Sequence, residues 1–121
     1  FRLKRIECFF TLLGLTCDYP YSFLKTMLLY SRKGYLMDGV LETISSMNGL
    51  ILVAATNGTD LPRKEKLLNS PIAVYIDSYY SAEILGTSKP NSSFFETIIS
   101  NYNIPKQKVL VIGDTIYTDK I

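Results

Sequence analysis

The sequence contains no histidine, and this absence removes several classes of chemistry. Ser-His and Cys-His mechanisms need an imidazole base, which these 121 residues do not supply. Metal sites built on imidazole are excluded for the same reason. Any metal held by these residues must be bound by oxygen, which favours hard cations such as Mg²⁺.

Cysteine, long apolar runs and net charge are also scarce. The two cysteines, Cys8 and Cys17, form no CxxC pair and are expected to be thiols rather than a disulfide. The longest apolar run, residues 50–55, is too short to span a membrane, and no signal peptide is visible. A net charge of +2 is too small to indicate nucleic-acid binding. We therefore expect a cytoplasmic protein without nucleic-acid or membrane partners. The oligomeric state is left open.

The apolar residues that are present follow two successive patterns. Helical spacing over residues 1–13 and about 20–32 predicts a pair of helices ahead of the first strand. The elements expected after residue 38 are a helix near 40–47, a strand at 50–55, a helix at 62–69, a strand at 72–76, a small edge strand at 79–84, a helix at 90–101 and a strand at 109–112. This alternation predicts an α/β fold, a partial doubly wound (Rossmann-like) parallel sheet with helices on both faces.

Three polar residues fall where such a sheet binds ligands, beyond the carboxyl ends of its strands. Thr56 follows the first strand, Asp114 follows the last, and Lys89 precedes a helix. Each has an ordinary interpretation alone: a turn residue, a helix cap and a surface lysine. Together they suit phosphate, because a hydroxyl can hold its oxygens, a lysine can neutralise charge and a carboxylate can bind a bridging Mg²⁺.

Three segments resemble, in order, motifs of the haloacid dehalogenase superfamily of phosphohydrolases. Residues 50–58, an apolar run ending in Thr-Asn-Gly, resemble motif II. Residues 86–95, with Lys89 in a Gly-x-x-Lys-Pro pattern, resemble motif III, and residues 109–119, which end in Gly-Asp-x-x-x-x-Asp, resemble motif IV. The resemblance implies that residues 35–121 are a partial α/β core and that residues 1–34 are the C-terminal part of a helical cap.

The resemblance also implies a role for each site residue. Thr56 and Lys89 would be catalytic, with Lys89 stabilising the nucleophile and an aspartyl-phosphate. The phosphate-binding residues would be Thr56, Asn57, Gly58 and Lys89. Asp114 would coordinate Mg²⁺. Asp119 would support the metal site without coordinating the ion. The implied activity is Mg²⁺-dependent hydrolysis of a small phosphorylated metabolite.

One motif of the superfamily is absent. Motif I is a strand ending in Asp-x-Asp-x-Thr, whose first aspartate attacks phosphorus, and these 121 residues contain no Asp-x-Asp. The chain therefore offers no nucleophile of its own, and its sheet would lack the central strand. We expect these residues to be part of a larger parent enzyme, and to be inactive and aggregation-prone alone.

Finer features favour one group within the superfamily. Thr-Asn-Gly at 56–58 followed by a basic helix, and Ser-Ala-Glu at 81–83, are most similar to the pyrimidine 5′-nucleotidases, which act on nucleoside monophosphates. Arg63 departs from that group, which usually has glutamine there. Two other interpretations remain: a catalytically inactive relic or truncated product that serves as an interaction module, and, less well supported, a phosphoryl-accepting receiver domain.

Overall fold

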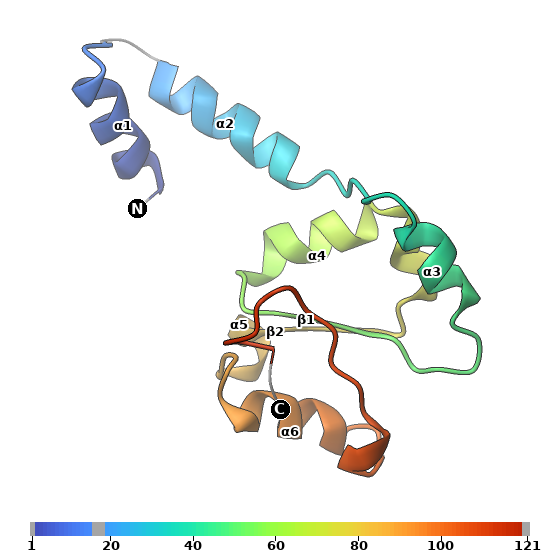
Figure 1. The fold of residues 1–121 in the computed structure, drawn as a ribbon. Helices are drawn as coiled ribbons and strands as arrows, with labels where there is room; N and C mark the ends of the chain where they lie inside the picture. The colour runs from blue at the N-terminus through green and yellow to red at the C-terminus, as the bar shows by residue number, and fades with distance from the viewer. Residues whose placement is uncertain (1, 16–18, 120–121) are drawn as a thin grey trace.

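The computed structural model describes residues 2–15 and 19–119. Its elements in chain order are α1 (Arg2–Leu12), α2 (Tyr19–Ser31), α3 (Val40–Ser46), β1 (Val53–Thr56), α4 (Asp60–Leu68), the 3₁₀ helix η1 (Pro71–Tyr75), β2 (Ser78–Ser81), α5 (Ala82–Leu85), α6 (Ser92–Ser100) and the 3₁₀ helix η2 (Lys106–Lys108). Figure 1 shows α1 and α2 projecting from a body that holds the strands. No helix in the described ranges is both long and apolar enough to cross a bilayer.

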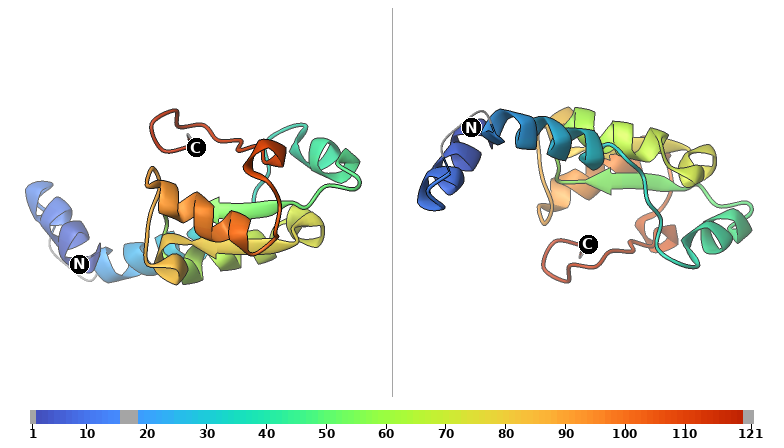
Figure 2. Two further views of the ribbon diagram at one scale, coloured as in Figure 1. Left: turned by 90° about the horizontal axis from the view of Figure 1, so that it is seen from below. Right: turned by 90° about the horizontal axis from the view of Figure 1, so that it is seen from above.

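The sheet consists of β1 and β2, which pair in parallel with Val53 opposite Ser78 and Thr56 opposite Ser81. The connection between parallel strands must cross over the sheet, and here it runs through α4 and η1. Figures 1 and 2 show α4 on one face of the strands and α6 on the other. The fold is thus mixed α/β, in agreement with the predicted partial Rossmann-like sheet.

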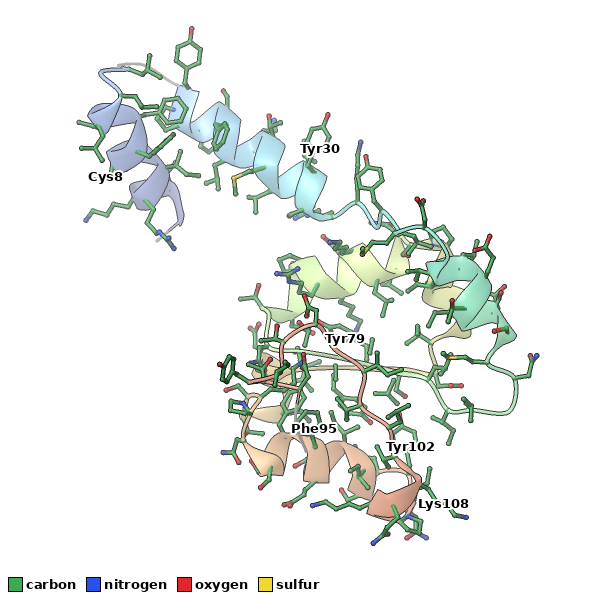
Figure 3. The ribbon with its side chains drawn as sticks, viewed as in Figure 1. Cys8, Tyr30, Tyr79, Phe95, Tyr102 and Lys108 are labelled. Atoms are coloured by element: carbon green, nitrogen blue, oxygen red, sulfur yellow. The ribbon has the colours of Figure 1, made fainter. Side chains whose placement is uncertain are left out.

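The core lies where α6 packs on the sheet. Its buried side chains are Phe94, Phe95 and Ile98, whose spacing of one and four residues places them on one face of the helix. Val53 and Ala55 pack against them, because alternate residues of β1 point to the same side of the sheet. In Figure 3 the Phe95 label marks this layer between α6 and the strands. This packing sets the position of the loop that precedes α6.

The predicted strand at residues 72–76 is wrong. Residues 71–75 form the 3₁₀ helix η1 instead, with the Ala73 amide donating to the Ser70 carbonyl at 3.0 Å. Pro71 stands in the first turn, where its fixed φ suits a helical turn and its missing N–H is not needed. A short apolar run does not by itself distinguish a strand from a helix. The second strand is β2, within the segment expected to form only an edge strand.

The predicted strand at residues 109–112 is also not formed. These residues have no regular secondary structure, and Leu110 and Ile112 are 82% and 76% exposed. Val111 still packs against the core, so the segment follows the sheet without joining it. No strand in the described ranges pairs with it, and a segment without backbone hydrogen bonds to a neighbour cannot form a ladder.

The two leading helices are joined to each other and to the body by few contacts. The rings of Phe10 and Phe23 meet edge to face with centroids 5.7 Å apart, which links α1 to α2. Beyond α2, Arg32 forms an ion pair with Glu65 of α4, with Nε and Oε2 2.8 Å apart. Cys8 is an exposed free thiol, and Cys17 lies outside the described residues.

Candidate functional site

The turn after β1 begins the candidate site. Thr56 is the last residue of the strand, and its Oγ1 accepts a hydrogen bond from the Gly58 amide at 3.1 Å. This bond closes a short turn, so Thr56 does have the role of a turn residue that the sequence allowed. Because Oγ1 acts as the acceptor, the hydroxyl proton of Thr56 remains able to donate to a ligand.

The Asn57 side chain joins this turn to the loop before α6. Its Oδ1 accepts a hydrogen bond from the Lys89 amide, and its Nδ2 donates to the Lys89 carbonyl, both at 2.8 Å. The two bonds connect residues that are 32 apart in the sequence. The Asn57 side chain is therefore occupied in holding Lys89, which sequence reasoning did not foresee. With the side chain engaged in this way, the backbone amide is the group of Asn57 that we expect to meet a phosphate.

The Lys89 side chain is largely buried at the carboxyl end of β1. Its ammonium forms an ion pair with the Asp119 carboxylate and lies 3.5 Å from the Ala55 carbonyl oxygen, and the Lys89 and Asp119 side chains are only 15% and 8% exposed. The hydrogen bond from Lys89 lowers the pKa of Asp119 below its usual value, although partial desolvation opposes the shift. Lys89 is thus not a surface lysine, and the structure brings it together with the residue expected to support a metal.

Asp114 stands apart from that pair. Its carboxylate is exposed, and Oδ1 accepts a hydrogen bond from the Thr115 hydroxyl at 3.3 Å. Asp119 Oδ2 accepts from the Thr115 amide at 3.2 Å, so one loop carries both aspartates. The oxygen donors suit Mg²⁺ in kind. These oxygen donors are too few to form a complete site. The described ranges contain no group of three or more aspartate, glutamate, histidine or cysteine side chains that could hold a metal ion.

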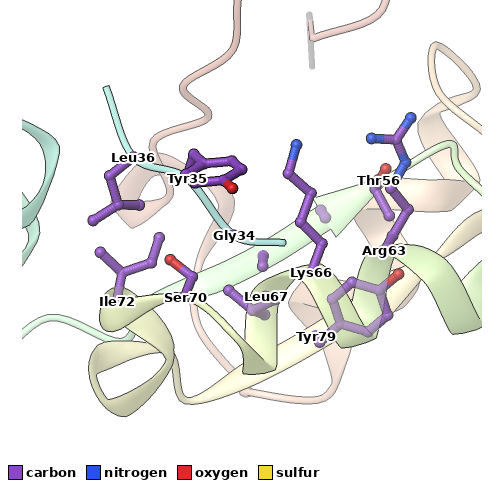
Figure 4. A pocket seen from close by; sticks show the side chains of 12 residues that line it. Gly34, Tyr35, Leu36, Thr56, Arg63, Lys66, Leu67, Ser70, Ile72 and Tyr79 are labelled. Carbon is purple, nitrogen blue, oxygen red and sulfur yellow. The ribbon is translucent and has the colours of Figure 1, made fainter. Parts of the chain in front are cut away.

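A cavity on the α4 face of β1 was not predicted. It has a volume of about 250 Å³, and Figure 4 shows Thr56, Arg63, Lys66 and Tyr79 among its walls. The Tyr79 hydroxyl donates to the Asp60 carbonyl at 3.3 Å. The pKa of Tyr79 is raised, first by burial and then by the Asp60 charge. Arg63 and Lys66 are three residues apart, which places both on one side of α4. This spacing was the signal in the sequence that could have indicated the basic side of the cavity.

We expect Asn57→Ala to loosen Lys89 without changing its ammonium. The variant loses two hydrogen bonds, each contributing about 0.5–1.5 kcal/mol, so the Lys89 amide should exchange with solvent roughly tenfold faster. Hydrogen exchange followed by NMR measures this. Asn57→Asp is the matched comparison, because it keeps the acceptor for the Lys89 amide while it loses the donor and adds a negative charge, and it should give a smaller acceleration. An unchanged Lys89 amide in Asn57→Ala would show that the two bonds do not hold the loop.

Comparison with known proteins gives one family and two curated relatives. The haloacid dehalogenase-like hydrolase family matches residues 4–119. A glyceraldehyde 3-phosphate phosphatase of Pyrococcus furiosus is 23% identical over 95 residues, covering 78% of this chain and 33% of that protein. Its namesake in Pyrococcus abyssi is 27% identical over 71 residues, covering 59% of this chain and 30% of that protein.

The chain thus spans about a third of the length of the curated relatives that it matches. No solved structure matches it significantly. The family match extends over nearly the whole sequence and includes the turn of Thr56, the loop of Lys89 and the segment of Asp114. The chain belongs to the haloacid dehalogenase-like hydrolases.

Proposed function

We propose that these residues form the phosphoryl-binding side of a Mg²⁺-dependent phosphate-monoester hydrolase. The observation that carries the proposal is the placement of the Lys89 ammonium, which is largely buried beside the carboxyl end of the strand that ends in Thr56. A buried cation next to a hydroxyl donor provides fixed positive charge for phosphate oxygens. The phosphatase names of two relatives support the same class of reaction.

Each residue has a part in this proposal. The Thr56 hydroxyl and the Asn57 backbone amide donate to the oxygens of the transferring phosphate, and Gly58 keeps the turn in place through its bond to Thr56. Lys89 balances the negative charge that gathers on the phosphate and on the attacking carboxylate. That carboxylate, an aspartate that forms the aspartyl-phosphate, has no candidate in an Asp-x-Asp pattern among these 121 residues. The proposal therefore assigns the nucleophile to residues outside this sequence.

Asp114 is the proposed protein ligand of Mg²⁺, because its carboxylate is exposed. When bound, the ion supplies charge neutralisation at a phosphate oxygen. Asp119 faces Lys89 and contributes by holding the ammonium in place. We further assign residues 1–34 to the C-terminal part of a helical cap and residues 35–121 to the partial core.

The substrate class is a small phosphate ester. The Thr-Asn-Gly turn and the basic α4 favour a nucleoside monophosphate, by resemblance to the pyrimidine 5′-nucleotidases. The names of the two curated relatives favour a three-carbon sugar phosphate. Both are monoesters that the same phosphoryl site would accept.

The test is a phosphate-release assay of the gene product that carries these residues, with both substrate classes and with Mg²⁺ present or chelated. We expect turnover that requires Mg²⁺. The encoding DNA upstream of residue 1 is read in parallel for a strand that ends in Asp-x-Asp-x-Thr. Absence of turnover together with absence of that motif would overturn the enzyme proposal and favour an interaction module.

A further inference from the structure

The cavity on the α4 face of β1 adjoins the phosphoryl site. Residues 34–36 form one wall, α4 and η1 form another, and residues 54–56 of β1 form the floor. Thr56 belongs both to this cavity and to the turn proposed to hold phosphate. A phosphate bound at Thr56 would therefore have its organic part directed either toward this cavity or into solvent.

The cavity combines an apolar interior with a basic rim. Its apolar lining includes Leu36, Ala54, Leu67 and Ile72. Its two charged residues are Arg63 and Lys66, and none of the lining residues is acidic. Figure 4 shows the Arg63 guanidinium beside Thr56 and the Lys66 side chain extending to the same side of β1. The rim is thus positive at the end nearest the proposed phosphate.

The Arg63 side chain is held against the turn by close packing. A Cβ at Gly58 would lie 2.7 Å from both Cγ and Nε of Arg63, so the absence of a side chain at residue 58 lets Arg63 lie over the turn. On the opposite wall, a Cβ at Gly34 would meet the Lys66 carbonyl oxygen of α4 and lie 2.6 Å from Ser70 Cβ, so residues 34–36 approach α4 closely. Both contacts depend on glycine and fix the walls of the cavity.

The charges of Arg63 and Lys66 are not balanced within the described part of the chain. The ion pairs found there join Arg32 to Glu65, Lys89 to Asp119 and Lys106 to Glu96. Like charges three residues apart on a helix repel each other. An anion placed between them would relieve that repulsion and gain two charge-assisted hydrogen bonds.

We propose that this cavity binds the organic part of a phosphate ester that carries a second anionic group, held by Arg63 and Lys66. The inference rests on the proposed function, because it takes Thr56 as the phosphate end of the ligand. A volume of about 250 Å³ lies below the roughly 300–1,000 Å³ of pockets for larger ligands, so a short carboxylated ester fits better than a nucleoside.

The test is an NMR titration, without Mg²⁺, of the gene product that carries these residues, with three probes: inorganic phosphate, glycerol 3-phosphate and 3-phosphoglycerate. The last two are both three-carbon phosphate esters and differ in that one has a carboxylate. We expect 3-phosphoglycerate to bind about tenfold more tightly than glycerol 3-phosphate. Lys66→Gln should reduce this preference about three- to tenfold and leave the affinity for inorganic phosphate nearly unchanged, whereas Arg63→Gln, beside Thr56 (Figure 4), should lower both the preference and the affinity for inorganic phosphate.

Lys64→Gln is the matched control, because Lys64 is exposed on the same helix and does not line the cavity. It should leave the preference intact. An equal loss in Lys64→Gln, or equal binding of the two esters by the unsubstituted chain, would overturn the inference while leaving the phosphoryl site standing. If inorganic phosphate shifts neither residues 56–58 nor Lys89, the proposed function fails first and this inference falls with it.

Discussion

Lys89→Met should lower phosphate-monoester turnover by the gene product about 10²–10³-fold. This is the usual loss when one fixed hydrogen-bond donor to the negative charge of the transition state is removed. The substitution removes the ammonium and keeps a side chain of similar length. It also keeps both bonds from Asn57, since these go to the backbone of residue 89. The loop should therefore stay in place, and the loss should fall on kcat more than on KM.

The same variant has a readout that needs no turnover. The hydrogen bond from Lys89 is the largest cause of the lowered pKa of Asp119, so the pKa should rise toward the ordinary carboxyl value of about 4 when the ammonium is removed. In the unsubstituted chain, the ionised pair stabilises the fold above that value, and this contribution is lost as the pH falls through the lowered pKa. Carboxyl ¹³C NMR follows the titration of Asp119.

Lys64→Met is the control for both measurements, because Lys64 is exposed on α4 and lies outside the site. It should change neither turnover nor the titration of Asp119. If Lys89→Met retains full turnover while Asp119 titrates at its ordinary pKa, Lys89 forms the ion pair without a role in catalysis, and the proposed phosphoryl site is wrong.

The strong helical patterns predicted helices that the structure contains, whereas two short apolar runs did not form the predicted strands. The helix that carries Phe94 and Ile98 shows its buried face directly in its spacing, and the structure confirms it as α6. The run at 109–112 is just as apolar, but a strand needs a hydrogen-bonded neighbour, which periodicity cannot supply. Pairing is a long-range property, which is why the run at 109–112 forms no strand, whereas the run at 72–76 follows the helical turn that begins at Pro71.

The site shows the same division between local and long-range information. The order of the elements predicted that Thr56 and Asp114 follow strands of one α/β fold and that Lys89 precedes a helix of the same fold. The sequence could not show that the Asn57 side chain would bind the backbone of Lys89, because those residues are 32 apart and the contact depends on the loop geometry. Nor could it show that Lys89 would pair with Asp119, which leaves Asp114 as the exposed carboxylate.

Phe94→Ala should destabilise the fold by about 3–5 kcal/mol, the usual cost of removing a buried phenylalanine ring. Phe94 is fully buried, and its ring meets that of Phe95 edge to face with centroids 5.4 Å apart. Since a domain of this size is stabilised by only about 5–15 kcal/mol, this loss would remove much of the stability. Urea unfolding followed by circular dichroism measures it.

Val74→Ala is the control, because Val74 is 83% exposed on η1 and its truncation should change the free energy of unfolding by less than about 0.5 kcal/mol.

The packing of Phe94 should also affect the position of Lys89. The Lys89 loop enters α6, whose first residue is Ser92, so a weakened contact between α6 and the sheet should loosen the loop as well. Phe94→Ala should therefore speed exchange of the Lys89 amide under native conditions, and Val74→Ala should not. If Phe94→Ala lowers stability and leaves that amide protected, the Asn57 bonds alone hold Lys89, and the core of α6 has no part in placing the ammonium.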